Sequence, residues 1–509
     1  MAHGDSERSA GKGGVSRRRF VKAAGASGIA VGVAGCTGDG GDGGGDGGGG
    51  GDTPTDTPIS TDPPEQDITL NFAADSNFKN SSDAINQTLH ENGGLPDNIT
   101  IKFQAGSFTS GDRQAKYQQL LNAGQKRPTL LMMDNGWTIP FIVRNQIANL
   151  SAALPSSVTS TVKEDYFQSM VATAQGQNGD LYGVPLFADF PTIQYRQDLF
   201  RQAGYSDSDF KKWATEPMKW DKFSETVAQV RDQTGTKMGF NWQGKDYIGL
   251  ACCDFVEFMG SWGGSYFGAF KNLFGPIGER PVTVAEDQVV DAVRMMRTFI
   301  YGQDDPKALS GFTQCSPKNV VSFTEEPSRK PFTEGNAVAL RNWPYSIVIN
   351  AKEKNFGKDL GTMPIPYHTP ASKSPYGPEI GGSTSALGGW HVTLNPNATD
   401  TRKRAAVQVF KALQNDQVRL DMFEIGGWIP PIPELVNSSA AKKLDPIGNY
   451  VDTLKVAGEN SVPRPVTAIW PAQSSKVSSQ VNAALRQKKT PTKALTQLKD
   501  TMLALEKQA

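Results

Sequence analysis

Four turns of the chain combine aromatic rings with carboxylate, amide or guanidinium groups. Each turn follows a short apolar stretch or a glycine-rich one. Aromatic rings can cover the flat C–H faces of a sugar, and planar polar side chains can satisfy its hydroxyl groups. Because each hydroxyl left unpaired in a closed cleft costs about 1–3 kcal/mol, such polar groups must converge from several loops. The four turns are Asp134–Trp137, Ala188–Phe190, Arg341–Tyr345 and Gly388–Trp390.

Structural roles are open for each of these side chains. Asp134 and Asp189 could be ordinary turn or capping residues, as most loop aspartates are. Trp343 precedes a proline and Trp390 follows two glycines, so a binding role and a packing role are both open for these rings. A lone tryptophan near a helix start, such as Trp220, indicates packing instead. The residue types alone therefore favour a carbohydrate site without requiring one.

An α/β scaffold is expected to position these turns. Strand candidates at Ile68–Ala73, Ile99–Ala105 and Thr129–Met133 alternate with helical patterns at Asp83–Glu91 and Asp112–Gly124. That order predicts a parallel sheet with helices on both faces. In such folds, ligands bind where loops leave the carboxyl ends of the strands. The loops that follow the strand candidates are therefore the expected place for a site.

The rest of the chain continues this pattern. Further strand candidates lie at Tyr182–Phe187, Ala337–Leu340 and His391–Leu394. The last helix is predicted to begin with Thr490 as N-cap and Pro491 at its first position. Its buried stripe is expected to consist of Leu495, Leu498, Met502 and Leu505.

The first 62 residues indicate an export signal, a lipid attachment point and a tether. Ser16–Lys22 is a twin-arginine motif, and the apolar run Ala23–Ala34 after it is too short to span a membrane. A sequence similar to a lipobox ends at Cys36. The alternative is an N-terminus with chance arginines, but the three features in register argue against it. We therefore expect a signal peptide at 1–35, lipidation of Cys36 and a disordered Gly/Asp/Thr/Pro tether at 36–65.

Charge and length narrow the classes of protein. The chain has 52 basic and 52 acidic residues, and loss of the signal peptide would leave a net charge of about −4. This balance argues against nucleic acid as a partner and against a basic membrane-binding surface. The part after the tether is long enough for two domains, and it has no apolar run long enough for a membrane span.

Three cysteines remain after Cys36, namely Cys252, Cys253 and Cys315. In an oxidising compartment one of the adjacent pair could bridge to Cys315 and leave an odd thiol, and buried free thiols are the alternative. The chain has only four histidines, and no Cys/His spacing is typical of a metal site. No metal and no cofactor are therefore expected.

A family resemblance rests on several motifs. Its most specific parts are Gly239–Tyr247, which continues through Cys253–Phe258, and Asn342–Tyr345. These segments resemble the trehalose/maltose-binding branch of the family 1 extracellular solute-binding proteins, the receptors of ABC sugar importers. The resemblance extends over Ile68 to Lys507, and supporting matches are Gly179–Pro185, Phe332–Ala337, Arg464–Thr467 and Trp470–Pro471.

The resemblance implies a two-lobed α/β fold of the periplasmic-binding-protein type, with hinge crossings and a central cleft. Lobe 1 would comprise 66–188 and 388–440, and lobe 2 would comprise 189–387 and 441–509. The implied function is capture of a carbohydrate, such as the disaccharides trehalose or maltose, by lobe closure and delivery to an ABC permease. The protein would be a monomer on the extracellular face of the membrane, kept beside the permease by its lipid anchor.

The resemblance also implies roles for particular residues. Asp134 and Asp189 would bind sugar hydroxyls, Trp343 and Trp390 would stack on sugar rings, and Arg464 would hold a hydroxyl from the far lobe. The further ligand-binding candidates are Asp75, Asn135, Trp137, Trp262, Tyr345, Gly389 and Trp470.

Three other classes of protein are alternatives to a carbohydrate-binding receptor. A secreted, lipid-anchored glycoside-processing enzyme could use Asp134 and Asp189 as acid and base, but the chain lacks G-x-S-x-G and H-E-x-x-H motifs. Gly239–Lys245 is a near miss for a phosphate loop, with Asp246 where a Ser or Thr is needed. A scaffold or adhesion lipoprotein without a small ligand is the third alternative. We expect a binding protein and not an enzyme.

Overall fold

The computed structural model describes residues 57–107 and 109–509. The predicted signal peptide, Cys36 and most of the predicted tether lie outside these residues. Where the tether overlaps them, the backbone is held: Ile59 N donates to Ala153 O at 3.2 Å, and Gln408 and Arg404 donate to the carbonyls of residues 61–63. No helix in the described part of the chain is long and apolar enough to cross a membrane.

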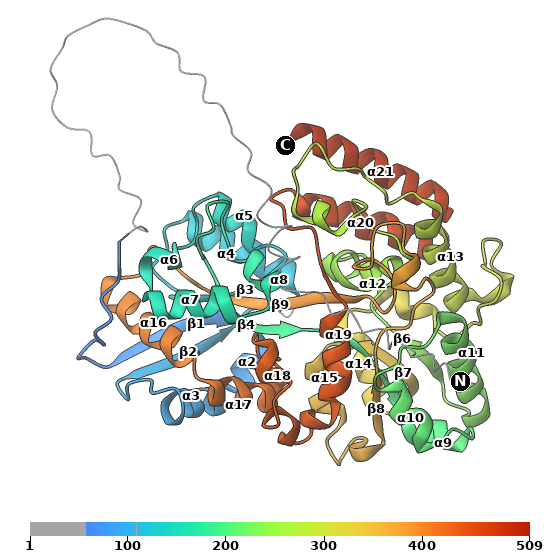
Figure 1. Ribbon diagram of the computed structural model, residues 1–509, viewed down its shortest axis with the longest axis horizontal. Helices are drawn as coiled ribbons and strands as arrows, with labels where there is room; N and C mark the ends of the chain where they lie inside the picture. Colours follow the sequence, from blue (N-terminus) through green and yellow to red (C-terminus); the bar gives the residue numbers. More distant parts are fainter. Residues whose placement is uncertain (1–56, 108) are drawn as a thin grey trace, which may run out of the picture.

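The first half of the fold is built on a six-stranded mixed sheet of order β10-β9-β3-β1-β2, with β4 also paired to β9 (Figure 1). β1 lies parallel to both β2 and β3, as the alternation of strands and helices predicts. β9 runs antiparallel to β3 and β4, and β10 runs parallel to β9. The strands are β1 Ile68–Ala74, β2 Ile99–Ala105, β3 Leu130–Asp134, β4 Val184–Asp189, β9 Ser385–Leu394 and β10 Ser461–Pro463.

Helices cover both faces of this sheet, so alternate residues of β1 pack in two different cores. Phe72 packs in the same core as Leu89 of α3, whereas Ala73 packs with Tyr117 of α4. We call this half the first lobe. Its helices are α2 Ser76–Asn80, α3 Ser82–Glu91, α4 Ser110–Asn122, α5 Thr138–Val143, α6 Leu150–Ala153, α7 Ser156–Asp165, α8 Gln168–Ala172, α16 Asp400–Ala412 and α17 Asp416–Gly426.

The other half, which we call the second lobe, has a four-stranded sheet of order β6-β7-β5-β8. β6 is parallel to β7, and β5 is antiparallel to β7 and β8. The strands are β5 Thr192–Arg196, β6 Met238–Asn241, β7 Ala337–Asn342 and β8 Leu360–Met363. The helices are α9 Gln197–Gln202, α10 Asp207–Trp213, α11 Trp220–Thr234, α12 Phe255–Gly260, α13 Asp287–Tyr301, α14 Glu325–Thr333, α15 Pro344–Asn350, α20 Trp470–Leu485 and α21 Pro491–Gln508.

The last helix forms as its sequence predicts. The Thr490 side chain accepts a hydrogen bond from Lys493 N, and Pro491 occupies the first turn of α21. Of the predicted stripe, Leu495, Leu498 and Met502 are fully buried in the core of the second lobe, and Leu505 is half-buried. The core of this lobe therefore depends on the end of the chain.

The two lobes are joined by several crossings of the chain. β4 leads directly into β5, β9 returns to the first sheet, and the chain crosses again between β10 and α20. A separate core lies at this joint and combines Ala188 of β4, Leu340 of β7 and Leu387 of β9 with Leu454 of α19 (Val451–Glu459). α18 (Pro433–Val436) packs nearby through Val436. β10 pairs with the first sheet, although it lies within the segment 441–509 that the resemblance assigns to lobe 2.

β9 differs from its predicted extent. The sequence predicts a strand only from His391, whereas β9 begins at Ser385 and includes the glycine-rich run before Trp390. Pairing with β4 and β10 holds this run in the sheet despite its low intrinsic strand preference. Gly389 has a φ of +128°, and a side chain there would meet Phe187 O at 2.7 Å. Only glycine fits at this position.

Candidate ligand-binding pocket

A pocket lies between the two lobes, and its volume is about 820 Å³ when the part open to solvent is included. Its walls come from the carboxyl ends of strands, as expected for an α/β fold. Asp75 follows β1 and Asp134 ends β3 in the first lobe, while Trp343 follows β7 in the second lobe. The predicted site residues that line it are Asp75, Asp134, Asp189, Trp343, Tyr345, Gly389, Trp390 and Arg464.

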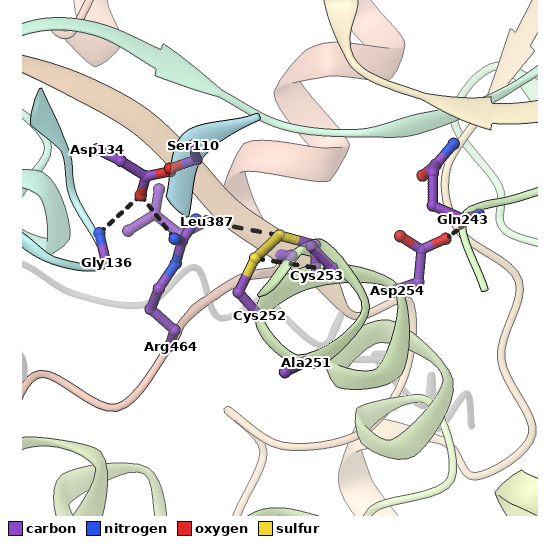
Figure 2. Close-up of a disulfide and its surroundings, with 12 residues drawn as sticks. Ser110, Asp134, Gly136, Gln243, Ala251, Cys252, Cys253, Asp254, Leu387 and Arg464 are labelled. Atoms are coloured by element: carbon purple, nitrogen blue, oxygen red, sulfur yellow. Dashed lines mark hydrogen bonds and ion pairs between the residues drawn. A yellow bond between two sulfur atoms is a disulfide. The ribbon is translucent and has the colours of Figure 1, made fainter. Parts of the chain in front are cut away.

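Asp134 is the most strongly hydrogen-bonded carboxylate in the pocket (Figure 2). Its Oδ1 accepts from Gly136 N at 2.8 Å and from Arg464 Nη1 at 2.6 Å, and its Oδ2 accepts from Ser110 Oγ at 2.7 Å. Arg464 comes from the segment after β10, so this ion pair ties that segment to the end of β3. Both side chains of the pair are buried.

Asp189, at the end of β4, differs from Asp134 in its hydrogen bonding. Its half-buried side chain forms no hydrogen bond or ion pair with any residue that the structure describes. Burial raises the pKa of this carboxyl well above its ordinary range, and the charges of Asp134 and Asp75 add to the rise, while Arg341 partly offsets it. Asp189 is therefore a carboxylate that lines the pocket and has no partner in the part of the chain that the structure describes.

Trp390, on β9, presents a half-buried indole to the pocket, and Arg113 of α4, which also lines the pocket, packs against this ring. The Arg113 guanidinium carbon lies 3.9 Å from the ring centroid. Arg113 is 1% exposed, its nearest carboxylate oxygen belongs to Asp75 at 4.0 Å, and its Nε and Nη1 lack hydrogen-bond partners among the described residues. A buried guanidinium with free donors is costly unless a ligand or water completes it.

Sequence reasoning missed Arg113 for a physical reason. Arg113, Tyr117 and Leu121 recur every four residues on α4, and this spacing indicates a packing stripe. The signal that could have revealed it is the presence of a charged residue in an otherwise buried stripe.

Trp343 forms the second-lobe wall. It precedes the first turn of α15, with Pro344 at the start of that helix. The Arg341 guanidinium carbon lies 4.6 Å from its ring centroid, and Arg341 is itself held by an ion pair with Glu257 and by donation to Gln243 Oε1 at 2.9 Å. The indole therefore rests on a buried and hydrogen-bonded support.

The ring of Trp343 also needs a glycine opposite it. A Cβ atom at Gly388, on β9, would lie 2.7 Å from the Trp343 ring. The Gly-Gly sequence before Trp390 thus serves the tryptophan of the other lobe as well.

Tyr247 and Glu325, two polar residues on the second-lobe side of the pocket, were not among the predicted site residues. Tyr247 donates its hydroxyl to Glu325 Oε1 at 3.0 Å, and both residues line the pocket. The predicted residue Tyr345 lies beside them and donates to Glu326 Oε1 at 2.9 Å. Burial raises the pKa of Glu325. Tyr247 ends the motif Gly239–Tyr247, which was its available signal.

Trp428 was also missed. It lines the pocket and packs on Phe78 with ring centroids 4.1 Å apart. The chain repeats the tripeptide Gly-Gly-Trp at Gly426–Trp428 and Gly388–Trp390, so the same signal was present twice.

Two candidates from the turn after β3 lie behind the pocket lining. Trp137 is fully buried, its ring meets Trp390 edge to face at 6.4 Å, and its Nε1 donates to Ser110 Oγ at 2.8 Å. Asn135 is buried, and its backbone N–H donates to Gly389 O at 3.1 Å. Both support pocket residues and do not line the pocket themselves.

Two other candidates lie in the core of the second lobe. Trp262 stacks on His368 with ring centroids 3.7 Å apart, and its Nε1 contacts Met295 Sδ at 3.3 Å. Trp470 is fully buried beside Tyr266, 5.1 Å between ring centroids. Neither tryptophan lines the pocket, because helix packing turns both rings into the core.

The cysteines match neither alternative in full, although Cys315 is a buried free thiol as the second alternative has it. Cys252 and Cys253 are bonded to each other, and Cys315 is a buried free thiol. The expectation of a bridge to Cys315 is therefore wrong. Cys315 is fully buried in the core of the second lobe, whereas the adjacent pair lines the pocket. In the part of the chain that the structure describes, no group of three or more His, Cys, Asp or Glu side chains could hold a metal ion.

Solved structures share this fold. Maltose-bound MalE3 of T. maritima superimposes with a TM-score of 0.69 at 24% identity, covering 85% of this chain and 98% of that one. The GacH receptor of Streptomyces glaucescens, solved unliganded and with acarbose, gives 0.68 at 18% identity over 86% and 98% of the two chains. A ribitol complex of a solute-binding protein from Agrobacterium radiobacter gives 0.64 at 16% identity over 87% and 100%. The fold is therefore the two-lobed fold of periplasmic binding proteins.

Sequence comparison agrees with the fold. A protein of Deinococcus radiodurans named "Probable ABC transporter-binding protein" is 26% identical over 453 residues, which cover 86% of this chain and 94% of that protein. The family model described as bacterial extracellular solute-binding protein matches residues 84–447, well over half of the chain. Fold and family are those of substrate-binding proteins and not of enzymes. This chain belongs to the bacterial extracellular solute-binding protein family.

Proposed function

We propose that this protein is the extracellular receptor of an ABC importer and captures a carbohydrate, a disaccharide such as maltose or trehalose. The observation that carries the proposal is the meeting of Trp343 from the second lobe with Trp390 and Asp189 around one pocket. Two indoles can cover sugar faces while carboxylates satisfy hydroxyls. The maltose bound to MalE3 of T. maritima and the name of the Deinococcus relative support the same class of ligand and transporter.

The free polar groups of the pocket suit hydroxyl ligands. Among the described residues, neither Asp189 oxygen has a hydrogen-bond partner, and Arg113 Nε and Nη1 donate no hydrogen bond, with the Asp75 carboxylate 4.0 Å from Nη1. A sugar hydroxyl both donates and accepts, so one ligand can satisfy both groups. Asp75 and Arg464 line the same pocket, but each already has a protein partner.

Capture follows from closure of the lobes. A sugar that touches walls from both lobes binds the closed state more tightly and shifts the population toward it. The closed shape would then be recognised by the transmembrane subunits of the permease. No bond forms or breaks in this cycle, and it needs no cofactor.

The rest of the proposal concerns location and organisation. The chain is exported by the twin-arginine route, lipidated at Cys36 and held at the outer face of the membrane as a monomer. The lobes divide at 66–188 with 388–440, and at 189–387 with 441–509, apart from β10 (Ser461–Pro463), which pairs with the sheet of the first lobe. Export and anchoring are supported by the N-terminal motifs of the sequence.

Glycoside processing by Asp134 and Asp189 is the alternative from another class. The contacts of Asp134 disfavour it, because Ser110, Gly136 and Arg464 already donate to its two oxygens. These three donors take up most of the acceptor capacity of the carboxylate and leave at most one position on Oδ2 for a substrate. Prolonged incubation with maltose or trehalose, followed by chromatography, should show no hydrolysis.

A thermal-shift panel tests the proposed function. The mature protein is heated with maltose, trehalose, glucose, mannitol or ribitol, each at increasing concentration. A ligand that binds only the native state stabilises it by RT ln(1 + [L]/Kd), and a micromolar Kd corresponds to about −8 kcal/mol. We expect a saturable rise in melting temperature with at least one disaccharide. The absence of a shift with every sugar would favour a scaffold protein.

A further inference from the structure

We propose that the disulfide between Cys252 and Cys253 is a ligand-contact surface, whose sulfur atoms pack against the apolar face of a ring-shaped ligand. This inference rests on the proposed function and adds a contact to the same pocket. Both cysteines line the pocket, within the π-helical turn Leu250–Asp254. The bond joins them to each other and leaves Cys315 as a free thiol.

The disulfide has both apolar and charged neighbours. Both cysteines pack in one small cluster with Trp343 and Ala386. Arg464 Nη2 lies 4.0 Å from the Sγ of Cys253. Figure 2 draws this contact as a dashed line. The disulfide therefore contacts the cluster of Trp343 and lies close to the buried pair of Arg464 with Asp134.

The chemistry of a disulfide fits this position. Two thiols would each carry a weak donor, whereas bonded sulfur atoms are polarizable and have no hydrogen to donate. Such a surface can contact C–H groups without leaving a donor unpaired. The hydroxyl groups of the ligand would instead meet Asp189 and Arg113, since in the described part of the chain the Asp189 carboxylate accepts no hydrogen bond and Arg113 Nε donates none.

A purely stabilising role is the competing explanation. Stabilisation of a fold by a disulfide grows with the length of the loop that it closes. A bond between neighbours closes the shortest loop possible, so little global stability is expected from it. Its effect is local, because it fixes the turn and sets which chemical groups face the pocket.

Accessibility in the folded protein is the first test. The native protein is treated with tris(hydroxypropyl)phosphine, a neutral reductant, then with iodoacetamide, and the modified cysteines are identified by mass spectrometry. The phosphine attacks one sulfur as the S–S bond breaks, and water completes its oxidation to the phosphine oxide while two thiols are released. We expect modification of Cys252 and Cys253, but of Cys315 only after denaturation. Reduction only after denaturation would overturn the inference.

Protection by ligand is the second test. A saturating disaccharide from the thermal-shift panel should slow the reduction at least about tenfold, because the bound sugar would cover the sulfur atoms. An unchanged rate in the presence of bound sugar would overturn the contact, even though sugar binding itself had been established.

Variants provide the third test. The double variant Cys252→Ala/Cys253→Ala should weaken disaccharide binding at least about fivefold by titration calorimetry, a loss near 1 kcal/mol. The matched control Cys315→Ala should leave the affinity within about twofold, because Cys315 lies outside the pocket. A double variant that melts lower but binds with unchanged Kd would mean that the disulfide is only structural. If no sugar binds the wild type, the proposed function fails and this inference fails with it.

Discussion

Arg464 Nη1 lies 2.6 Å from Asp134 Oδ1, and this contact joins the segment after β10 to the end of β3 at the edge of the pocket. Glycine at position 136 makes the contact possible, since a Cβ there would lie 2.1 Å from Arg464 Nη1. The pair holds this wall of the pocket in place. Asp134 therefore supports the site through a protein contact.

Removing one member of this pair should destabilise the protein. Asp134→Asn or Arg464→Met alone would leave a buried charge without its partner, at a cost of about 3–5 kcal/mol. The double variant should lose clearly less than the sum of the two single losses. Chemical denaturation of the four proteins gives the coupling energy. Additive losses would show that the two side chains do not interact.

Trp390→Ala should weaken disaccharide binding at least about tenfold, which corresponds to about 1.4 kcal/mol or more. The indole is half-buried and faces the pocket, so its loss removes a stacking surface but little of the core. Trp390→Phe keeps an aromatic face and should lose less. Calorimetry measures the affinity, and circular dichroism checks the fold. An unchanged isotherm for the alanine variant would remove Trp390 from the site.

Asp189→Asn should stabilise the unliganded protein increasingly as pH rises. Burial raises the pKa of Asp189 in the folded protein, so the native state holds this proton above the pH at which the unfolded chain has released it. Wild-type stability therefore falls as pH rises from about 4 toward the raised pKa, whereas asparagine does not titrate. We expect the variant to melt at least about 2 °C higher at pH 8 and no higher at pH 4.

The same variant should bind disaccharide less well at pH 8, because one oxygen acceptor is replaced by an amide. Thermal melts at pH 4, 6 and 8, with and without sugar, separate the two effects. A difference in melting temperature that stays constant across this range would contradict the buried, unpaired state of Asp189.

Gly388→Ala should weaken sugar binding through Trp343. The added Cβ would lie 2.7 Å from the indole, so the ring must move from its support on Arg341. We expect at least about a fivefold rise in Kd. Gly111→Ala is the matched control, because a Cβ there meets nothing within 4 Å and Gly111 does not line the pocket. Equal affinity of both variants would show that the position of Trp343 does not affect binding.

Much of the fold could be predicted from the sequence, because the hydrophobic pattern follows the secondary structure closely. The strands near Ile68, Ile99 and Leu130 and the helices between them form the expected parallel unit. The start of β9 could not be predicted, since pairing with β4 and β10 holds a glycine-rich run in the sheet.

The residues of the binding site could likewise be predicted only in part. Residues in turns after strands, such as Asp189 and Trp343, line the pocket because the strand ends converge there. Trp137 and Trp470 are tryptophans like Trp343, but each lies at the start of a helix, and the helix turns the ring into a core. Arg113 could not be identified because its helix stripe resembles a packing stripe. Tertiary contacts alone distinguish these cases.

The hydrogen bonds of residues 59–63 to Ala153, Arg404 and Gln408 determine how a mechanical load enters the molecule. All three partners belong to the first lobe. A pull on the chain upstream of residue 57 is therefore transmitted to that lobe alone. Under the proposed lobe closure and N-terminal anchoring, the second lobe would therefore be the part that moves relative to the membrane.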